Sequence, residues 1–230
     1  PAQQVSENAF SYLPDAAIRV VGILEAGGFE AWFVGGFVRD ALLGRPCSDI
    51  DIASNASWQQ AQALFEAAGF MTHETGAAHG TLTVLVGNEA FEVTTYRRDG
   101  TYSDSRHPSS VEFVSSIEED LARRDFTMNA IAFHPLRGLL DPYGGVGDLQ
   151  AKTIRAVGDP TKRFSEDALR ILRACRFAAQ LGFDIDDETL FGMLSNKGIV
   201  YRVSAERVAH ELWLLYTSPS PRDTERSRMP

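Results

Sequence analysis

The chain has 230 residues, is 44% hydrophobic and 23% charged, and carries a formal net charge of −9. This length suffices for one core, or for one core and a small second domain. The negative charge argues against a surface that coats nucleic acid through a broad basic patch, so any RNA contact must be local or supplied elsewhere. No apolar run reaches the roughly 20 residues of a membrane span and no leader-like segment opens the chain, which favours a cytoplasmic protein without membrane contact.

The first predicted elements are a helix and a strand that precede a Gly-Gly turn. A helix over about Pro14 to Ala26 is scaffold, and a short apolar strand, Trp32 to Val34, follows it. Gly35 and Gly36 then form a turn before a helix over Phe37 to Leu43. Backbone N–H groups at such a turn suit a phosphate, and Arg39 adds a cation. The alternative is a Gly-Gly turn without a ligand.

Two carboxylates follow in the run Asp49-Ile50-Asp51-Ile52, which alternates polar and apolar residues. As a strand, this run places Asp49 and Asp51 on one face. Paired carboxylates repel unless cations compensate, and oxygen ligands suit magnesium that holds substrate phosphates. The alternative is two solvated aspartates on an edge strand.

A capped helix and a hairpin come next. Ser57 caps a predicted helix over Trp58 to Ala68, and strands over Thr81 to Val86 and Ala90 to Thr95 form a β-hairpin. The second strand presents Glu92 opposite Phe91 and Val93, where it can join the two aspartates or remain a solvated residue.

The central segments are less regular. We interpret Arg97 to Ser110 as a loop, either a surface turn or a substrate gate. An ordered turn that enters the sheet is predicted from an acidic run, followed by Arg123-Arg124-Asp125 and then by an apolar strand through Phe133. The alternative is a solvated cluster of charges, which is the usual state of an isolated Arg-Arg-Asp. A turn-rich link over 141–149 leads to a strand over 153–157.

The remaining segments are predicted to be helical. One helix with Ser165 as N-cap extends to about Leu181, with an apolar stripe that includes Cys175 and with Arg170 and Arg173 nearly opposite. Such a charged face is normally only solvated. Further helices are predicted over 187–196 and 204–216, whereas residues 217–230 are read as a disordered or non-native tail. Both cysteines, Cys47 and Cys175, are expected to be reduced, packed thiols.

Five motifs resemble, in the same order, those of the class II tRNA nucleotidyltransferases, the CCA-adding enzymes, whose close relatives are the bacterial poly(A) polymerases. They are GGFVRDALLG (35–44), DIDIAS (49–54), RRDFTMNA (123–130), EDALRILRA (166–174) and SAERVAHEL (204–212). The resemblance implies an α+β fold, with a polymerase-β-like head (residues 1–157) of mostly antiparallel sheet flanked by helices. An all-α neck (158–216) follows, and the nucleotide is expected in the cleft between them.

The resemblance also implies the roles of individual residues. Asp49 and Asp51 would bind two Mg²⁺ ions, with Glu92 as a further catalytic carboxylate. The nucleotide would be bound by glycines, arginines and three other polar residues: Gly35, Gly36, Arg39, Arg123, Arg124, Asp125, Asn129, Asp167, Arg170, Arg173 and Arg176. Within the loop, Asp99-Gly100 and Arg106-His107-Pro108 would help to select the nucleotide.

The chemistry of the bases supports a reading role for Asp167 and Arg170. A carboxylate only accepts hydrogen bonds and a guanidinium only donates them. Cytosine and adenine offer an amine beside an unprotonated ring nitrogen, whereas uracil and guanine present a carbonyl and a protonated nitrogen. The pair should therefore accept CTP and ATP.

The predicted function is template-independent transfer from CTP or ATP to the 3′-hydroxyl of tRNA, by a two-metal mechanism. A bacterial poly(A) polymerase is one alternative, and a non-catalytic nucleotide- or RNA-binding module is another. Family members continue into helical body and tail domains that grip tRNA, so we expect weak tRNA binding by this acidic chain.

Overall fold

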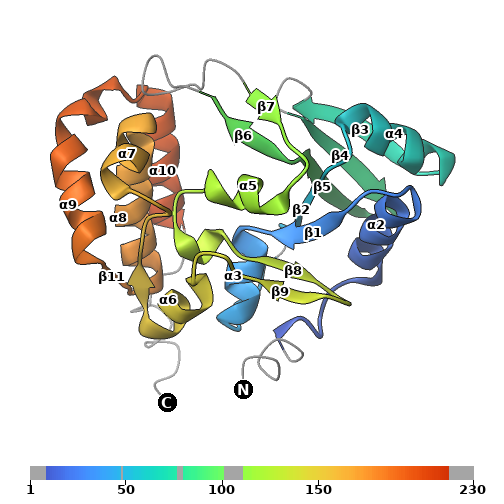
Figure 1. Cartoon of the computed structure of the whole chain (residues 1–230), viewed down its shortest axis with the longest axis horizontal. Coiled ribbons are helices and arrows are strands. Elements are labelled where there is room, and N and C mark those ends of the chain that lie inside the picture. Colours follow the sequence, from blue (N-terminus) through green and yellow to red (C-terminus); the bar gives the residue numbers. More distant parts are fainter. Residues whose placement is uncertain (1–8, 48, 77–79, 101–110, 218–230) are drawn as a thin grey trace. The chain divides into compact units, whose positions relative to one another are not determined.

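The computed structural model describes residues 9–47, 49–76, 80–100 and 111–217 (Figure 1). The chain divides into two compact units. The first, here called the sheet unit, comprises Pro1–Arg98, Val111–Arg124 and Asn129–Tyr143. The second, the helical unit, comprises Asp99–Ser110, Asp125–Met128 and Gly144–Pro230.

A seven-stranded sheet forms the centre of the sheet unit. The strands are β1 (Ala31–Val34), β2 (Asp51–Ser54), β3 (Met71–Gly76), β4 (Thr81–Val86), β5 (Glu89–Thr95), β8 (Ala132–His134) and β9 (Gly138–Leu140). Their order is β3-β4-β5-β2-β1-β8-β9. Every neighbouring pair is antiparallel except β2 and β5, which are parallel. The predicted α+β fold with a mostly antiparallel sheet is confirmed.

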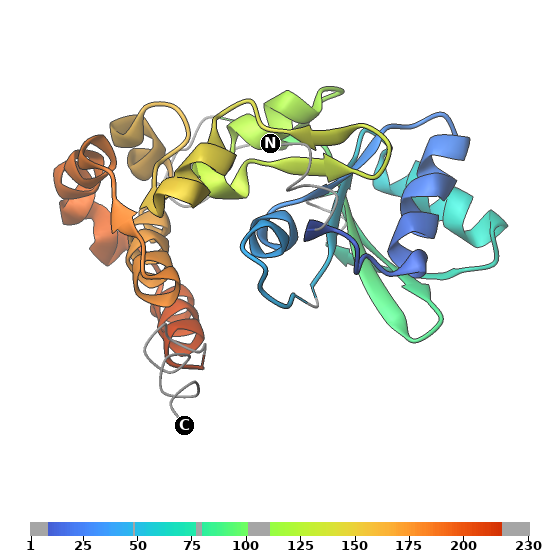
Figure 2. The ribbon, with the colours of Figure 1, turned by 90° about the horizontal axis from the view of Figure 1, so that it is seen from below.

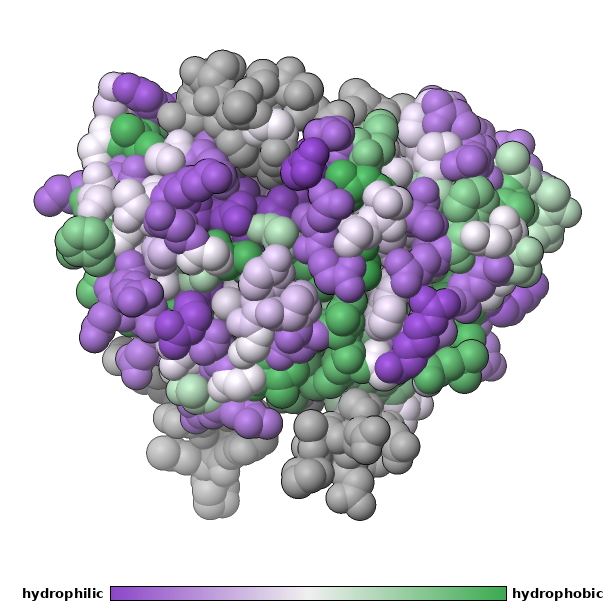
Figure 3. All heavy atoms as spheres, viewed as in Figure 1, coloured by the Kyte–Doolittle hydropathy of each residue, from purple (hydrophilic) through white to green (hydrophobic). Residues whose placement is uncertain are grey.

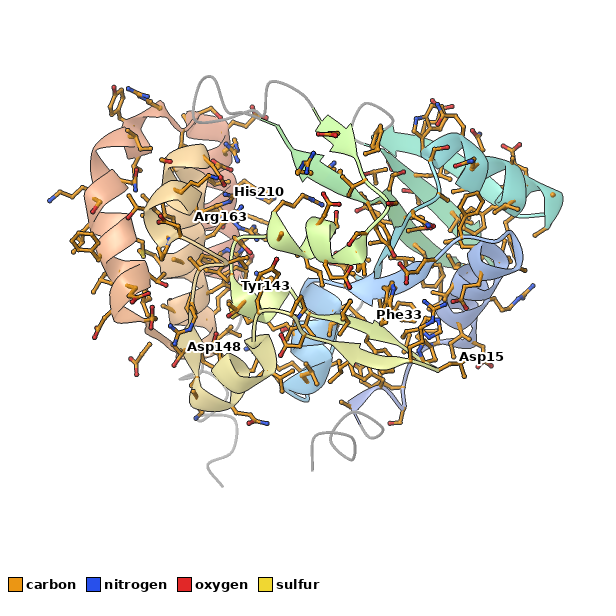
Figure 4. All side chains as sticks on the ribbon, in the orientation of Figure 1. Asp15, Phe33, Tyr143, Asp148, Arg163 and His210 are labelled. Carbon is orange, nitrogen blue, oxygen red and sulfur yellow. The ribbon has the colours of Figure 1, made fainter. Side chains whose placement is uncertain are left out.

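Helices cover both faces of this sheet. They are α2 (Asp15–Ala26), α3 (Gly36–Leu42), α4 (Trp58–Ala67) and α5 (Ile117–Ala122). Figure 2 shows α2 and α4 on one face of the sheet and α3 on the other. Phe33 of β1, labelled in Figure 4, is fully buried, as are Phe37 of α3 and Phe65 of α4. The ring centres of Phe33 and Phe37 lie 5.8 Å apart, so these side chains pack α3, the helix that follows the glycine turn, against β1.

Three short elements lie where the chain passes from one unit to the other. A small two-stranded sheet pairs β6 (Arg97–Asp99) with β7 (Val111–Phe113). A 3-10 turn, η2, follows at Thr127–Asn129. At α4 the predicted cap is confirmed, because the Ser57 side chain accepts from the Gln60 backbone N–H and the Gln60 side chain accepts from the Ser57 N–H.

The helical unit contains five helices among its described residues. They are α6 (Gly145–Ala151), α7 (Pro160–Glu166), α8 (Leu169–Leu181), α9 (Asp187–Asn196) and α10 (Ala205–Thr217), with a 3-10 turn η3 (Lys197–Arg202). Two very short strands, β10 (Thr153–Ile154) and β11 (Asp184–Ile185), pair in parallel. Gly192 of α9 packs against α7, where a Cβ would come within 2.7 Å of Pro160 Cβ. This contact lets two helix backbones approach closely.

The structure corrects the predicted helix over residues 165–181. It is broken at Asp167, whose φ of −144° ends α7, and α8 starts at Leu169. Ser165 lies inside α7 and donates to the Lys162 carbonyl, so it is not an N-cap. The actual start is Asp159, whose side chain accepts from the Lys162 N–H ahead of the Pro160 turn.

Several smaller expectations were also wrong or incomplete. Strand β2 begins at Asp51, so Asp49 precedes it, and Arg97–Asp99 forms β6 instead of loop. Helices α5 and α6 and strand β3 were not predicted. Cys47 and Cys175 are both free thiols, but Cys175 is exposed and therefore not packed. Thr217, predicted to begin the disordered or non-native tail, is the last residue of α10. The rest of that tail, 218–230, and residues 106–108, predicted to help select the nucleotide, lie outside the described residues.

No helix in the described part of the chain is long and apolar enough to cross a membrane. The face seen in Figure 3 is largely hydrophilic, with hydrophobic residues in smaller groups. Such a mixture is usual for protein surfaces, because there is not enough polar surface to cover a folded chain.

Candidate active site

Two carboxylates lie side by side on β2 and β5, and a third precedes β2. Asp51 is the first residue of this strand and is paired in register with Glu92 of the parallel strand β5. Residues in register on neighbouring strands point to the same face, so Glu92 stands beside Asp51 as expected. Asp49, two residues before Asp51, is exposed.

The electrostatics of Asp51 reflect these neighbours. Burial raises the pKa of Asp51 to about 6; Arg124 opposes the rise, and the charges of Glu92 and Asp49 add to it. Arg124 offsets only part of the effect of burial and of the neighbouring carboxylates on Asp51, so the three carboxylates together carry uncompensated negative charge at neutral pH. A bound cation would stabilise their ionised form.

The glycine turn leaves space for Arg124 beside Asp51. Gly35 has φ +71° and ψ −136°, a conformation that residues with a Cβ rarely adopt. A Cβ at this position would lie 2.8 Å from Arg124 Nη1 and 3.6 Å from Asp51 Oδ2. Gly35 is therefore needed both for its backbone conformation and for the space that Arg124 occupies.

Arg39 is held next to Gly36 by two partners. Its Nε and Nη2 donate to the two oxygens of Asp40, at 2.9 and 2.8 Å, and its Nη1 donates to Asn129 Oδ1 at 2.8 Å. A Cβ on Gly36 would lie 3.6 Å from Arg39 Nη2. The predicted residues Gly36, Arg39 and Asn129 are thus brought together, and Asp40 is an additional member.

Arg123 and Arg124 share one carboxylate. Arg123 Nε lies 2.9 Å from Asp120 Oδ1, and Arg124 Nη2 lies 3.2 Å from Asp120 Oδ2. Arg124 Nη1 also lies 3.5 Å from the carbonyl oxygen of Asn129. Of the two arginines, Arg124 is the one whose guanidinium lies beside Gly35.

In the helical unit, Asp125 fixes Arg173. Asp125 Oδ2 accepts from Arg173 Nε at 2.7 Å, and Asp125 Oδ1 accepts from the Phe126 N–H at 2.8 Å. Asp125 is buried, and its charge is the main cause that raises the pKa of Arg173. Both predicted residues thus lie together, already paired.

Asp167 and Arg170 have separate partners. Both oxygens of Asp167 bind the Arg207 guanidinium, at 3.2 and 2.8 Å, and Oδ1 also accepts from the Leu169 N–H at 3.0 Å. Arg170 Nη1 donates to Glu166 Oε2 at 2.7 Å and to the carbonyl of Arg163, labelled on α7 in Figure 4, at 2.9 Å. Asp167 and Arg170 are thus oriented by different groups and do not neutralise each other in these contacts.

Arg176 joins α8 to α10. It is buried, and its Nε donates to the buried Glu211 at 2.6 Å while its Nη1 donates to Gln180 at 2.8 Å. Its guanidinium carbon also lies 4.2 Å from the Phe177 ring centre. These contacts give Arg176 a packing role in the described structure, and its contact with a nucleotide stays a prediction.

The residues that the sequence did not single out are the anchors of the arginines and of Asp167. Asp120 stands three and four residues before its arginines, a helical spacing that could have indicated the pairing. Asp40 is next to Arg39 in the sequence, and adjacent residues have no helical spacing that would indicate a pair. The Arg207–Asp167 pair joins residues 40 positions apart, and no local pattern reports it.

Carboxylate oxygens are suitable ligands for a hard cation, but few of them gather in this site. Among the described residues, no group of three or more His, Cys, Asp or Glu side chains is arranged to hold a metal ion. Asp49 and Asp51 could supply oxygen ligands, and a divalent cation beside half-buried Asp51 would lower the raised pKa of this residue.

Comparison with known proteins gives consistent matches. A family model described as the poly(A) polymerase head domain matches residues 31–155. The chain is 49% identical over 198 residues to a CCA-adding enzyme of Listeria monocytogenes, covering 86% of this chain and 49% of that protein. It is 47% identical over 212 residues to one of Streptococcus thermophilus, covering 91% and 52%.

Solved structures agree. The crystal structure of the Bacillus stearothermophilus CCA-adding enzyme in complex with CTP matches with a TM-score of 0.81 and 40% identity, over 95% of this chain and 50% of that one. A tRNA nucleotidyltransferase complexed with a primer tRNA and an incoming ATP analogue matches with a TM-score of 0.70 and 33% identity, over 85% and 55%.

The chain spans about half the length of the curated relatives it matches. The family model nevertheless covers more than half of the chain, including the glycine turn, the three carboxylates and the paired arginines. The chain therefore belongs to the poly(A) polymerase head-domain family of nucleotidyltransferases.

Proposed function

We propose that this chain transfers nucleotides from CTP or ATP to the 3′-hydroxyl of tRNA, as CCA addition or repair. The observation that carries this proposal is the position of Arg124 against Gly35, with Asp51 Oδ2 beside it and Glu92 in register. Nucleotidyl transfer needs cationic donors for the triphosphate next to carboxylates that hold metal ions. The names of similar proteins agree with this reaction.

Magnesium would be held by Asp49 and Asp51. Two ions bound there would lower the pKa of the attacking hydroxyl and stabilise the charge of the leaving pyrophosphate. Glu92 adds negative charge on the same face of the sheet, which favours a divalent cation at Asp51. Arg124 donates from Nη1 to the phosphates, and Arg39, held by Asp40 and Asn129, supplies a second cation near Gly36.

Base selection is assigned to Asp167 and Arg170. Three hydrogen bonds of Asp167 are used for Leu169 and Arg207, whereas a carboxylate offers about four acceptor positions, so one position can take the exocyclic amine of cytosine or adenine. Arg170 would donate to the ring nitrogen beside that amine. Because Arg207 and Glu166 anchor the two residues, a wrong base cannot easily rotate them into a matching pattern.

The primary test is nucleotide incorporation with a tRNA that lacks its 3′ end. Asp49→Ala is expected to abolish incorporation, while the fold is retained because Asp49 is exposed and lies outside the strand. Glu89→Gln, an exposed carboxylate at the start of β5, is the matched control and should retain activity. Full activity of Asp49→Ala would refute the assignment.

The same assay separates the alternatives when each nucleotide is given alone. Use of CTP supports CCA addition, and growth with ATP only indicates a poly(A) polymerase. Binding of magnesium and CTP without any turnover indicates a non-catalytic module.

A further inference from the structure

Asp120 is a buried carboxylate with an unusual number of donors around it. Only 1% of its surface is exposed, although it lies on the six-residue helix α5. It accepts hydrogen bonds from Arg123 Nε at 2.9 Å, from Arg124 Nη2 at 3.2 Å and from the backbone N–H of Arg97 at 3.3 Å. Burial disfavours the ionised form, but the charges of Arg123 and Arg124 together with the hydrogen bonds from Arg123 and the Arg97 N–H outweigh it and keep the pKa of Asp120 below its ordinary value.

An exposed ion pair between α5 and β6 provides a contrast. Glu119, the adjacent residue, pairs with Arg98 at 3.2 Å, and both side chains are largely exposed, at 42% and 54%. Such exposed pairs contribute little. The arginine side chains bound by Asp120 are only 18% exposed, so their position depends on this carboxylate much more strongly.

The geometry of Arg124 links Asp120 to the candidate active site. The guanidinium is planar and rigid, so a bond at Nη2 also fixes where Nη1 points. Nη2 is bound to Asp120, and Nη1 occupies the space beside Gly35, near Asp51 Oδ2. Arg124 Nη1 also lies 3.5 Å from the Asn129 carbonyl oxygen, but the bond of Nη2 to the Asp120 carboxylate is shorter and joins opposite charges, so it is the stronger restraint on this long, flexible side chain.

We propose that Asp120 is a positioning residue that holds Arg124 in the orientation in which its Nη1 binds the triphosphate of the incoming nucleotide. This inference rests on the proposed function for the phosphate ligand, but the orientation of Arg124 is independent of it. Asp120 touches neither substrate nor metal ion; it acts through Arg124. Preorganisation of this kind strengthens binding because the order is already present before the nucleotide arrives.

The experiment has two measurements on the chain as it stands. The first follows the guanidinium of Arg124 by ¹⁵N NMR without nucleotide; rotation about its Cζ–Nε bond should be slow in the wild type and fast in Asp120→Asn. The second is calorimetric binding of CTP and CMP with magnesium. We expect Asp120→Asn to weaken CTP binding about tenfold, the loss of one charge-assisted contact, and to leave CMP binding nearly unchanged.

Variants separate positioning from general stability. Glu119→Gln should affect Arg98 alone and leave CTP binding as in the wild type. Arg124→Gln should weaken CTP binding as Asp120→Asn does, and the double variant should bind no more weakly than Arg124→Gln. If Asp120→Asn does not fold, Asp120→Glu keeps the charge, moves it by one methylene, and should still loosen Arg124 and weaken CTP binding.

The outcomes are distinct. The positioning role would be overturned if the Arg124 guanidinium still rotated slowly in Asp120→Asn, or if this variant bound CTP as tightly as the wild type. It would also be overturned if the losses of CTP affinity in the two single variants added up in the double variant. Absence of CTP binding by the wild type, with Arg124 released in Asp120→Asn, would instead overturn the proposed function and leave the orienting contact established.

Discussion

Replacing Gly35 by alanine should both destabilise the chain and displace Arg124. The backbone at φ +71° and ψ −136° costs about 1–3 kcal/mol for a residue with a Cβ. The new Cβ would also lie 2.8 Å from Arg124 Nη1, so the guanidinium must move by several tenths of an ångström and strain its bond to buried Asp120. We expect a total loss of about 2–4 kcal/mol in the free energy of unfolding.

Two other glycines divide this loss into its parts. Gly44 has φ +65° but no atom within 4 Å of its Cβ position, so Gly44→Ala should show backbone strain alone, about 1–2 kcal/mol. Gly36 has no positive φ, and its Cβ would make an ordinary contact at 3.6 Å with Arg39 Nη2, so Gly36→Ala should not lose stability.

Thermal and denaturant unfolding of the three variants gives the measurement. For a chain of this size we expect Gly35→Ala to lower the Tm by roughly 5–15 °C. Nucleotide incorporation at a temperature where all variants are folded should fall about a hundredfold in Gly35→Ala, because the phosphate ligand is displaced. If Gly35→Ala matched Gly44→Ala in both stability and activity, the steric conflict with Arg124 would be disproved.

The remaining predictions concern charge. Because the folded pKa of Asp51, about 6, lies above its unfolded value of 3.8, the folded state binds the extra proton; the free energy of unfolding should fall by up to about 3 kcal/mol as pH rises from about 4 to 6. In denaturant unfolding, the Asp51→Asn variant should not show this fall in the free energy of unfolding. If the variant and the wild type depended on pH in the same way, the prediction would be wrong. Removing one member of the buried Arg176–Glu211 pair should cost about 3–5 kcal/mol, whereas Arg176→Met with Glu211→Leu should cost less than either single change in urea unfolding. Asp167→Asn should raise the use of UTP relative to CTP in single-nucleotide assays, since an amide can donate to a carbonyl; Arg207→Gln, which loosens Asp167, should reduce selectivity without creating a preference for UTP. Unchanged ratios in both variants would refute base reading by Asp167.

The sequence alone determined the features that depend on residues close in the chain. The alternation of apolar residues in β4 and β5, the cap at Ser57 and the positions of α2, α9 and α10 follow local patterns, and the structure has them nearly as expected. Local reasoning failed where two start signals competed, as at Asp159 and Ser165, because a proline in the first turn favours the earlier start.

The tertiary structure alone decided which polar groups far apart in the sequence meet. The chain has 22 Lys and Arg residues and 31 Asp and Glu residues, so a sequence pattern cannot select distant partners among them. Arg39 with Asn129, 90 residues apart, and Asp167 with Arg207, 40 apart, are brought together by the path of the backbone. The motifs thus predicted which residues bear the chemistry, whereas the fold decided which distant groups anchor them, since polar contacts between distant residues form only after packing has fixed the backbone.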